Sequence, residues 1–177
     1  MDNITKEIIG ASFEDFVTEK LYTKLQSEFY IIQSLPLYSC GLHKVTEVDI
    51  LLVTRFGIFC LECKNVRTSI KGNYEDKMWT TNSGRYYNKM FNPSMQNRMH
   101  IRALKRLLRS YTDNIPNVYN FVVIPNHCKY VGNCPEVKTI GCLFAELQHL
   151  SVIKEKTVDV KYYKEILKNI VGGFEIE

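Results

Sequence analysis

The sequence lacks the segments that would mark a membrane, secreted or multidomain protein. Its apolar runs all fall well short of the ~20 residues that span a bilayer, and Asp2, Lys6 and Glu7 stand where a signal peptide needs an apolar core. It also has no internal repeat, no proline- or glycine-rich linker and no low-complexity tract. We therefore expect a single domain over residues 1–177, located in the cytoplasm and without membrane contact.

The sequence also lacks the cysteine and histidine spacings of zinc sites. Of its six cysteines, Cys60 and Cys63 form a CxxC, but the surrounding residues predict a strand, which would send the two thiols to opposite faces. The four histidines form no HxH or HExxH pattern, so we expect each to be an ordinary core or surface residue. Because the cytosol keeps thiols reduced, disulfides are not expected either.

Acidic residues are absent from one long stretch of an otherwise balanced sequence. The chain has a net charge of +4, but residues 77–112 contain eight basic side chains and no acidic one. The remainder of the chain carries 15 basic against 19 acidic residues. A segment that reverses the charge of its own domain is a candidate surface for a polyanion such as nucleic acid.

Hydrophobic periodicity predicts an α/β (α+β) domain. Apolar residues recur at helical spacing over residues 5–26, and again over residues 158–171, where two glycines would close the helix. Another helix is predicted over residues 94–111, with Asn92 or Ser94 as its N-cap. Together with the strands between them, these helices predict a central mixed β-sheet flanked by helices.

The predicted strands follow alternating or continuous apolar patterns bounded by turn residues. They cover residues 29 to about Gly41, 46–53, 57–65, 68–70, 118–125 and 138–143. A short turn joins the second and third of these strands in a hairpin. Residues 72–93 are rich in Asn, Tyr and Gly without a clear period, so we expect loop structure around Trp79.

Acidic residues cluster at neighbouring ends of the second and third predicted strands. Alternation puts Glu47 and Asp49 on one face of the second strand, and Glu62 and Lys64 on one face of the third. Antiparallel pairing across the turn sets residues whose numbers sum to about 111 opposite each other. This pairing brings Asp49 level with Glu62, or close to it.

Two carboxylates in this arrangement predict a metal site. Side by side they repel each other and one takes up a proton, unless a hard cation such as Mg²⁺ binds between them through oxygen ligands at ~2.1 Å. The alternative is ordinary cross-strand ion pairing on a solvated sheet face. Apolar residues share the same strand faces, which favours the metal site, because charges at the border of a core usually have a task.

The first predicted helix carries an acid on its apolar side. At about 100° per residue, Glu14 falls between Val17 and Leu21, whereas Asp15 and Glu19 fall outside the apolar arc. An acid on a buried stripe needs a partner, which makes Glu14 a candidate neighbour of the acidic cluster. The alternative is a glutamate at the edge of the stripe that reaches to water.

The predicted helix over residues 94–111 has a basic face and an apolar face, with Gln96 on the apolar side. The basic residues lie within an arc of about 100° and are Arg98, Arg102, Lys105, Arg106 and Arg109. A basic ridge beside a metal site would hold phosphates and provide salt-dependent affinity for nucleic acid. The alternative is a plain solvated face, but such faces normally mix charges of both signs.

These residues, taken in order, resemble the NERD (nuclease-related) domains of the PD-(D/E)xK superfamily. The matching set is Gly10, Phe13-Glu14, Glu47-x-Asp49, Gly57-Ile58-Phe59, Glu62-Cys63-Lys64-Asn65, Gly72, Trp79 and Asn92-Pro93-x-x-Gln96. The resemblance is strongest over residues 10–110. Residues 111–177 would complete the sheet and add a C-terminal helix.

The resemblance implies a restriction-endonuclease-like fold with Mg²⁺ or Mn²⁺ at its active site. Asp49, Glu62 and the backbone carbonyl of Cys63 would bind the metal. Lys64 would orient or deprotonate the attacking water and stabilise charge on the phosphate. Glu14 and Gln96 would correspond to polar residues that the superfamily carries on its first and second helices.

The leading hypothesis is a metal-dependent (endo)deoxyribonuclease, with DNA favoured over RNA. A second hypothesis is a nucleic-acid-binding or regulatory module that keeps the fold without turnover and acts with a partner protein. A third is an interaction domain whose basic helix docks onto an acidic partner. The sequence is compatible with a protein partner or a homodimer, and with endonuclease as well as exonuclease action.

Overall fold

The computed structural model describes the backbone of residues 3–39 and 44–174, and the side chains of residues 12–37 and 45–172. The predicted strand end near Gly41 lies outside the described residues. In chain order the elements are α1 (Asn3–Lys24), β1 (Phe29–Ser39), β2 (Lys44–Thr54), β3 (Gly57–Cys63), β4 (Ser69–Lys71), β5 (Met78–Ser83), β6 (Tyr86–Phe91), α2 (Pro93–Leu108), β7 (Val118–Ile124), β8 (Lys129–Val131), β9 (Val137–Thr139), α3 (Ile140–Ile153) and α4 (Val160–Phe174).

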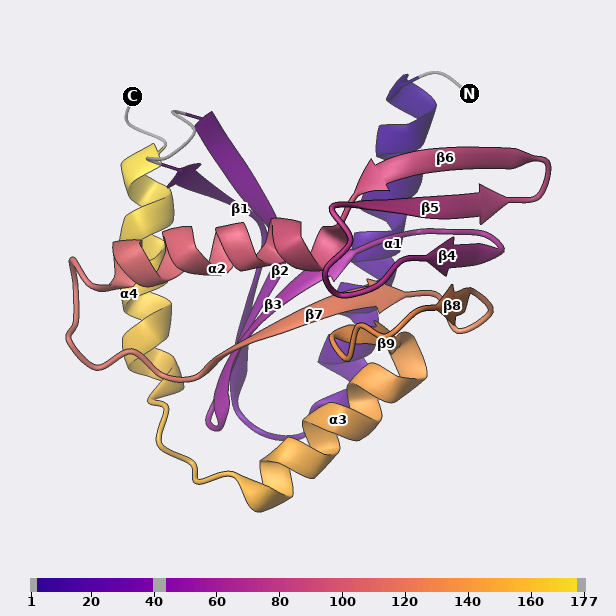
Figure 1. Cartoon of the computed structure of the whole chain (residues 1–177). Coiled ribbons are helices and arrows are strands. Elements are labelled where there is room, and N and C mark those ends of the chain that lie inside the picture. Colours follow the sequence, from indigo (N-terminus) through magenta and orange to yellow (C-terminus); the bar gives the residue numbers. More distant parts are fainter. Residues whose placement is uncertain (1–2, 40–43, 175–177) are drawn as a thin grey trace.

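The main sheet has the strand order β1-β2-β3-β7-β9. Its first three strands pair antiparallel, whereas β3, β7 and β9 run parallel. Helices α2 and α4 pack on one face, and α1 and α3 pack on the other (Figure 1). The predicted α/β fold with a central mixed sheet flanked by helices is confirmed.

Burial on both faces explains the composition of the central strands. Every residue of β3 is buried, as expected for a central strand with helices on both sides. In β2, Leu51 and Val53 pack towards α2 and α4, whereas Ile50 and Leu52 pack towards α1 and α3. The described part of the chain contains no helix that combines the length and apolarity needed to cross a membrane.

A second sheet, with the order β6-β5-β4-β8, forms where the sequence analysis predicted a loop. The prediction of loop structure over residues 72–93 is wrong, because β5 and β6 pair as a hairpin through Gly84, whose φ is +80°. This hairpin is largely exposed on both strands, so its sequence carries no apolar alternation to reveal it. Trp79 is the exception, with no exposed surface.

The C-terminal region corrects two further predictions. Residues 138–143 were predicted to be a strand, but β9 ends at Thr139, whose hydroxyl accepts a hydrogen bond from the Cys142 N–H and caps α3. The last helix begins at Val160 and continues through its two glycines to Phe174, so the glycines do not close it. Helix α3 itself was missed, although its buried residues recur at helical spacing.

Asn92 is the N-cap of α2, and its side chain is fully satisfied. The side-chain oxygen accepts from the N–H groups of Ser94 and Met95, and the amide donates to the carbonyls of Tyr74 (3.1 Å) and Asp76 (2.8 Å). One buried side chain therefore ties the start of α2 to the loop before the β5–β6 hairpin. The predicted cap is confirmed, in agreement with the preference for asparagine at this position.

Gly72 is required by the packing of Trp79. The indole Nε1–H donates to the Asn73 carbonyl at 2.9 Å, and the ring then covers Gly72 so closely that a Cβ there would lie 2.1 Å from Trp79 Cδ1. Because the Trp79 ring is buried and closely packed, it cannot move aside to make room for a Cβ at position 72.

Gly72→Ala should therefore lower the free energy of unfolding by about 1–3 kcal/mol, as overpacking of a buried site does. The matched control is Gly172→Ala in α4, where an added Cβ meets nothing within 4 Å; helix propensity makes it neutral or stabilising by up to about 1 kcal/mol. Chemical denaturation of the two variants measures the difference. Equal stability of both variants would show that the ring does not enforce glycine at position 72.

Candidate active site

The candidate site lies where β2 and β3 separate. Their pairing ends at Ile50 opposite Leu61, so the next position in register brings Asp49 level with Glu62, as predicted. Instead of a backbone bond, the Asp49 Oδ2 accepts the Cys63 N–H at 2.7 Å. A carboxylate thus takes the place of a backbone acceptor at the end of the central strand.

The alternation of side chains in β2 breaks at Asp49. Val48 packs in the same cluster as Leu51, towards α2 and α4, although the two positions differ by an odd number. On β1, Ser34 stands opposite Asp49 with a φ of +51° and outside the paired register. Glu47 therefore projects to the face of α1, where its charge helps to raise the pKa of Glu14.

Glu62 has no exposed surface and lies between the side chains of Lys64 and His100. The Lys64 ammonium forms an ion pair with Glu62 Oε1, and His100 Nε2 lies 3.5 Å from Oε2. Apart from these contacts, neither carboxylate oxygen has a hydrogen-bond partner within the described part of the chain. A buried carboxylate with spare acceptor capacity is costly unless a cation or water completes its shell.

His100 reaches the site from α2 and was missed by the sequence analysis, which treated it as an ordinary residue. Its side chain is 2% exposed, and its Nδ1 lies 2.9 Å from Thr46 Oγ1. The ring is therefore held from β2 on one side while its other nitrogen faces Glu62. Its position at the centre of the apolar face of α2 was a usable signal, of the same kind that identified Glu14 on α1.

The site contains more carboxylates than cationic side chains, because Asp49 and Glu62 share the single ammonium of Lys64. Burial and the charge of Glu62 raise the pKa of Asp49 to about 7. Burial alone would lower the pKa of Lys64, but the carboxylates of Glu62 and Asp49 outweigh it and raise the pKa, so the ammonium stays charged. Without a further cation, the cluster therefore holds more negative charge than Lys64 neutralises.

Glu14 belongs to this electrostatic cluster. It is half-buried on α1, and burial together with the charges of Glu47 and Glu62 raises its pKa, although the Lys64 ammonium acts in the opposite direction. The first helix thus brings a third carboxylate to the site from the other face of the sheet. Glu14 also keeps partial access to water, as the alternative for this residue expected.

Gln96 is half-exposed one turn before His100 on the same side of α2. The fully buried polar residue beside it is Asn97, which the sequence analysis did not select. The Asn97 amide donates to the Cys60 carbonyl and to Asn120 Oδ1, both at 2.7 Å. These bonds fix α2 against β3 and β7 and so hold His100 over Glu62.

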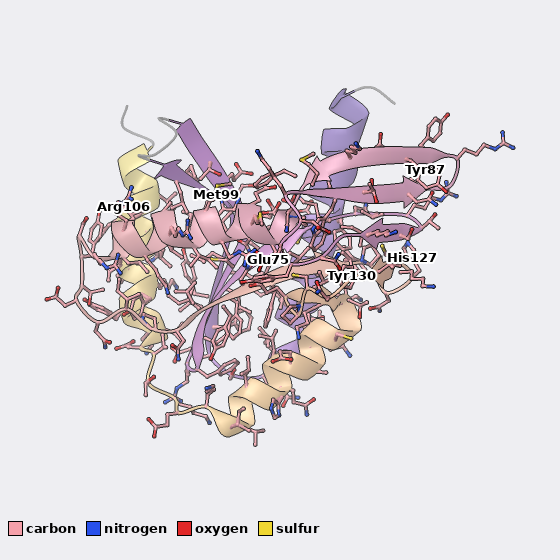
Figure 2. All side chains as sticks on the ribbon, viewed as in Figure 1. Glu75, Tyr87, Met99, Arg106, His127 and Tyr130 are labelled. Carbon is pink, nitrogen blue, oxygen red and sulfur yellow. The ribbon has the colours of Figure 1, made fainter. Side chains whose placement is uncertain are left out.

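The basic face of α2 points away from the core. Ile101, Leu104 and Leu108 are buried against the sheet, whereas the basic residues lie on the opposite side of the helix. Arg98 lies over the ring of Tyr74, at 4.1 Å from its centroid, and Lys105 is half-exposed. The remaining members are exposed: Arg102, Arg106 and Arg109, of which Figure 2 labels Arg106.

The two thiols of the CxxC, Cys60 and Cys63, are both buried. Cys60 packs towards α2 and α4 and Cys63 packs towards α1 and α3, so their predicted separation to opposite faces is confirmed. Burial raises the pKa of both thiols well above the ordinary range, which keeps them protonated. Among the side chains that the structure describes, no three His, Cys, Asp or Glu residues gather around one point.

Comparison with known proteins now identifies the family. The model of the nuclease-related domain, NERD, matches residues 9–125. The chain belongs to the NERD family. The matched part of this NERD domain runs from α1 to the end of β7 and contains Glu14, Asp49, Glu62, Lys64 and His100.

Part of the chain also matches a curated relative. An uncharacterized protein of Bacillus anthracis is 26% identical to the chain over 99 residues, which is 56% of this chain and 46% of the relative. The match thus spans about half the length of that relative. No solved structure matches the chain.

The raised pKa of Asp49 predicts how stability changes with pH. Between the ordinary aspartate pKa of about 3.9 and the value of about 7 in the folded protein, the folded state binds more protons than the unfolded state. Stability in the absence of metal should therefore fall as pH rises through this window. Asp49→Asn keeps an oxygen for the Cys63 N–H but removes the charge, so it should not show this fall.

At pH 8 without metal, Asp49→Asn should melt several degrees above wild type, since roughly 2–4 °C accompany each kcal/mol in a chain of this size. At pH 4 this gain should largely vanish. Thermal melts across the pH range, with EDTA and then with Mn²⁺, measure both effects; Mn²⁺ should stabilise wild type only. A variant less stable than wild type at pH 8, or a gain independent of pH, would contradict the charge imbalance.

Proposed function

We propose that this NERD domain is a nuclease that hydrolyses phosphodiester bonds in nucleic acid, with DNA as the preferred substrate and Mg²⁺ or Mn²⁺ as cofactor. The observation that carries the proposal is the wholly buried Glu62 carboxylate, with unused acceptor capacity, beside Asp49 and Lys64. Membership of the nuclease-related family supports the same class of activity.

The donor atoms fit a hard divalent cation. The N–H and C=O of one residue in a strand point to the same side, so the Cys63 carbonyl faces Asp49, just as its N–H does. Asp49, Glu62 and this carbonyl would then hold the metal through oxygen atoms alone, which is the ligand type that Mg²⁺ and Mn²⁺ prefer. This ligand set contains only two side chains, so it does not require three His, Cys, Asp or Glu side chains around one point, and the described residues contain no such group.

A bound divalent cation would lower the pKa of a water molecule and polarise the scissile phosphate. The charged Lys64 ammonium, at the mouth of the site, holds the attacking water and stabilises negative charge that develops on the phosphate. Glu14, with its raised pKa and partial access to water, can accept or return a proton. His100, fixed by Thr46, orients the Glu62 carboxylate.

Purified protein should cut plasmid and linear DNA with Mg²⁺ or Mn²⁺ and lose activity in EDTA. Glu62→Gln and Lys64→Met should each reduce kcat by about 10²–10³, as the loss of one electrostatic stabiliser does. Glu146→Gln is the matched control. Glu146 forms an ion pair with Lys138, at 3.2 Å, and does not belong to the cluster of Asp49, Glu62 and Lys64. If Glu62→Gln and wild type show the same residual cleavage, the proposed site is wrong.

A second candidate is a nucleic-acid-binding or regulatory module without turnover. It is favoured by the basic face of α2, because its exposed arginines could bind phosphates without any contribution from Asp49 or Glu62. Binding that persists in EDTA, without cleavage of any DNA or RNA substrate in either metal, would select this candidate over the nuclease.

The basic face of α2 predicts the salt dependence of binding in either case. Replacing Arg102 and Arg106 by Gln should flatten the plot of log affinity against log salt by about 0.9 for each lost phosphate contact on duplex DNA. Arg55→Gln, at the β2–β3 turn, is an exposed control that should leave the slope unchanged. Fluorescence anisotropy at several salt concentrations measures the slopes. Equal slopes for all three proteins would show that α2 does not bind the phosphates.

A further inference from the structure

The β5–β6 hairpin carries two tyrosines whose side chains are among the most exposed large hydrophobic side chains of the described residues. Tyr86 is 74% exposed and Tyr87 is 76% exposed, and both stand next to the turn at the tip of the hairpin. Figure 1 shows the hairpin extending from the body of the domain past the beginning of α2. In Figure 2, Tyr87 projects from β6 into open space.

These rings lack the aromatic packing that two other exposed tyrosines make. Tyr22 packs against Phe29, with ring centroids 5.4 Å apart, and Tyr162 packs edge-on against its neighbour at 5.3 Å. By contrast, no ring contact within the described residues includes Tyr86 or Tyr87. Their cross-strand partners are Ser83 and Asn82, which are too small and polar to cover an aromatic ring.

The two rings lie on opposite faces of the hairpin. Met90 pairs with Trp79 and packs in its cluster, and alternation along β6 places Tyr86 on the same side as Met90. Tyr87 is then on the other side, together with the exposed Lys89. Each face of the tip therefore offers an aromatic surface on which a planar group can stack.

Positive charge surrounds both rings. Arg85 and Lys89 are exposed on the hairpin, and no acidic residue occurs between Lys77 and Thr112. The end of β6 leads directly into α2, and the Asn92 N–H donates to the Lys77 carbonyl at the base of the hairpin. The hairpin is thus joined without a flexible linker to the helix that carries the basic face.

We propose that the β5–β6 hairpin binds single-stranded nucleic acid, with unpaired bases stacked on Tyr86 and Tyr87 and phosphates paired with Arg85 and Lys89. Aromatic surfaces for bases and basic side chains for the backbone are the two elements of sequence-independent single-strand binding. The proposal rests on the proposed function and refines it: a nucleic acid with an unpaired segment gains contacts with the hairpin in addition to those that α2 makes with any phosphate backbone. Duplex DNA, whose bases are stacked on each other, offers no free base to these rings.

The test separates stacking from charge by the choice of probe. Binding is measured by anisotropy in EDTA, so that no cleavage occurs, with labelled oligothymidylate, a fully abasic oligonucleotide of the same length, and a duplex. Wild type should bind oligothymidylate more tightly than the abasic strand. The double variant Tyr86→Ser/Tyr87→Ser should lose about 10-fold or more on oligothymidylate and nothing on the abasic strand or the duplex.

Two sets of variants provide the controls. Tyr22→Ser and Tyr162→Ser remove other exposed tyrosines and should leave all three affinities unchanged. Arg85→Gln and Lys89→Gln should each reduce the salt slope on single strands by about 0.7, whereas the tyrosine variants keep the wild-type slope. Because the replaced tyrosines are 74% and 76% exposed, the double variant should melt at close to the wild-type temperature, which thermal melting verifies.

Wild-type affinity of the double variant for oligothymidylate would overturn the proposal, and so would equal losses on all three probes. Either result would leave the nuclease assignment intact, because cleavage depends on Asp49, Glu62 and Lys64. Conversely, a base-dependent loss in a protein that never cleaves would support the hairpin as a binding surface and refute the nuclease.

Discussion

The carboxylate of Glu62, at the end of the central strand β3, has no contact with solvent. The groups around it are arranged so that they stabilise this buried charge. Glu62 is reached by Lys64 from its own strand and by His100 from α2, while Asp49 replaces a backbone acceptor beside it. Burial makes these charges interact strongly, which raises the pKa of Asp49 to about 7. Because the folded state keeps a proton on Asp49 that the unfolded state releases, the stability of the domain is linked to pH.

The parts of the fold that bury apolar residues could be predicted from the sequence. Strands β2 and β3 and helices α1, α2 and α4 carry clear periodic patterns, and their pairing placed Asp49 level with Glu62. The β5–β6 hairpin has no such pattern, because both of its strands are exposed and only Trp79 is anchored in the core. Helix α3 was hidden because its first residues, Ile140 to Leu143, follow β9 without a turn residue that separates strand from helix apart from Gly141.

The site itself was predictable in its centre and less so at its edges. The ExK spacing and strand alternation brought Asp49, Glu62 and Lys64 together, but local sequence does not reveal the irregular pairing at Ser34, which breaks the alternation of β2 between Val48 and Leu51. His100 depends on the tertiary contact of α2 with β3, which Asn97 enforces through hydrogen bonds to that strand and to β7. For His100 and Asn97, the signal available in the sequence was a polar residue on the apolar face of a predicted helix.

Location of the metal in crystals grown with Mn²⁺ tests the central claim most directly. An anomalous difference map should show one strong peak bounded by the carboxylates of Asp49 and Glu62 and the carbonyl of Cys63, each at about 2.1 Å. Crystals of Asp49→Asn grown in the same way should lack the peak. A wild-type map without a peak there, with Lys64 alone facing Glu62, would contradict the account.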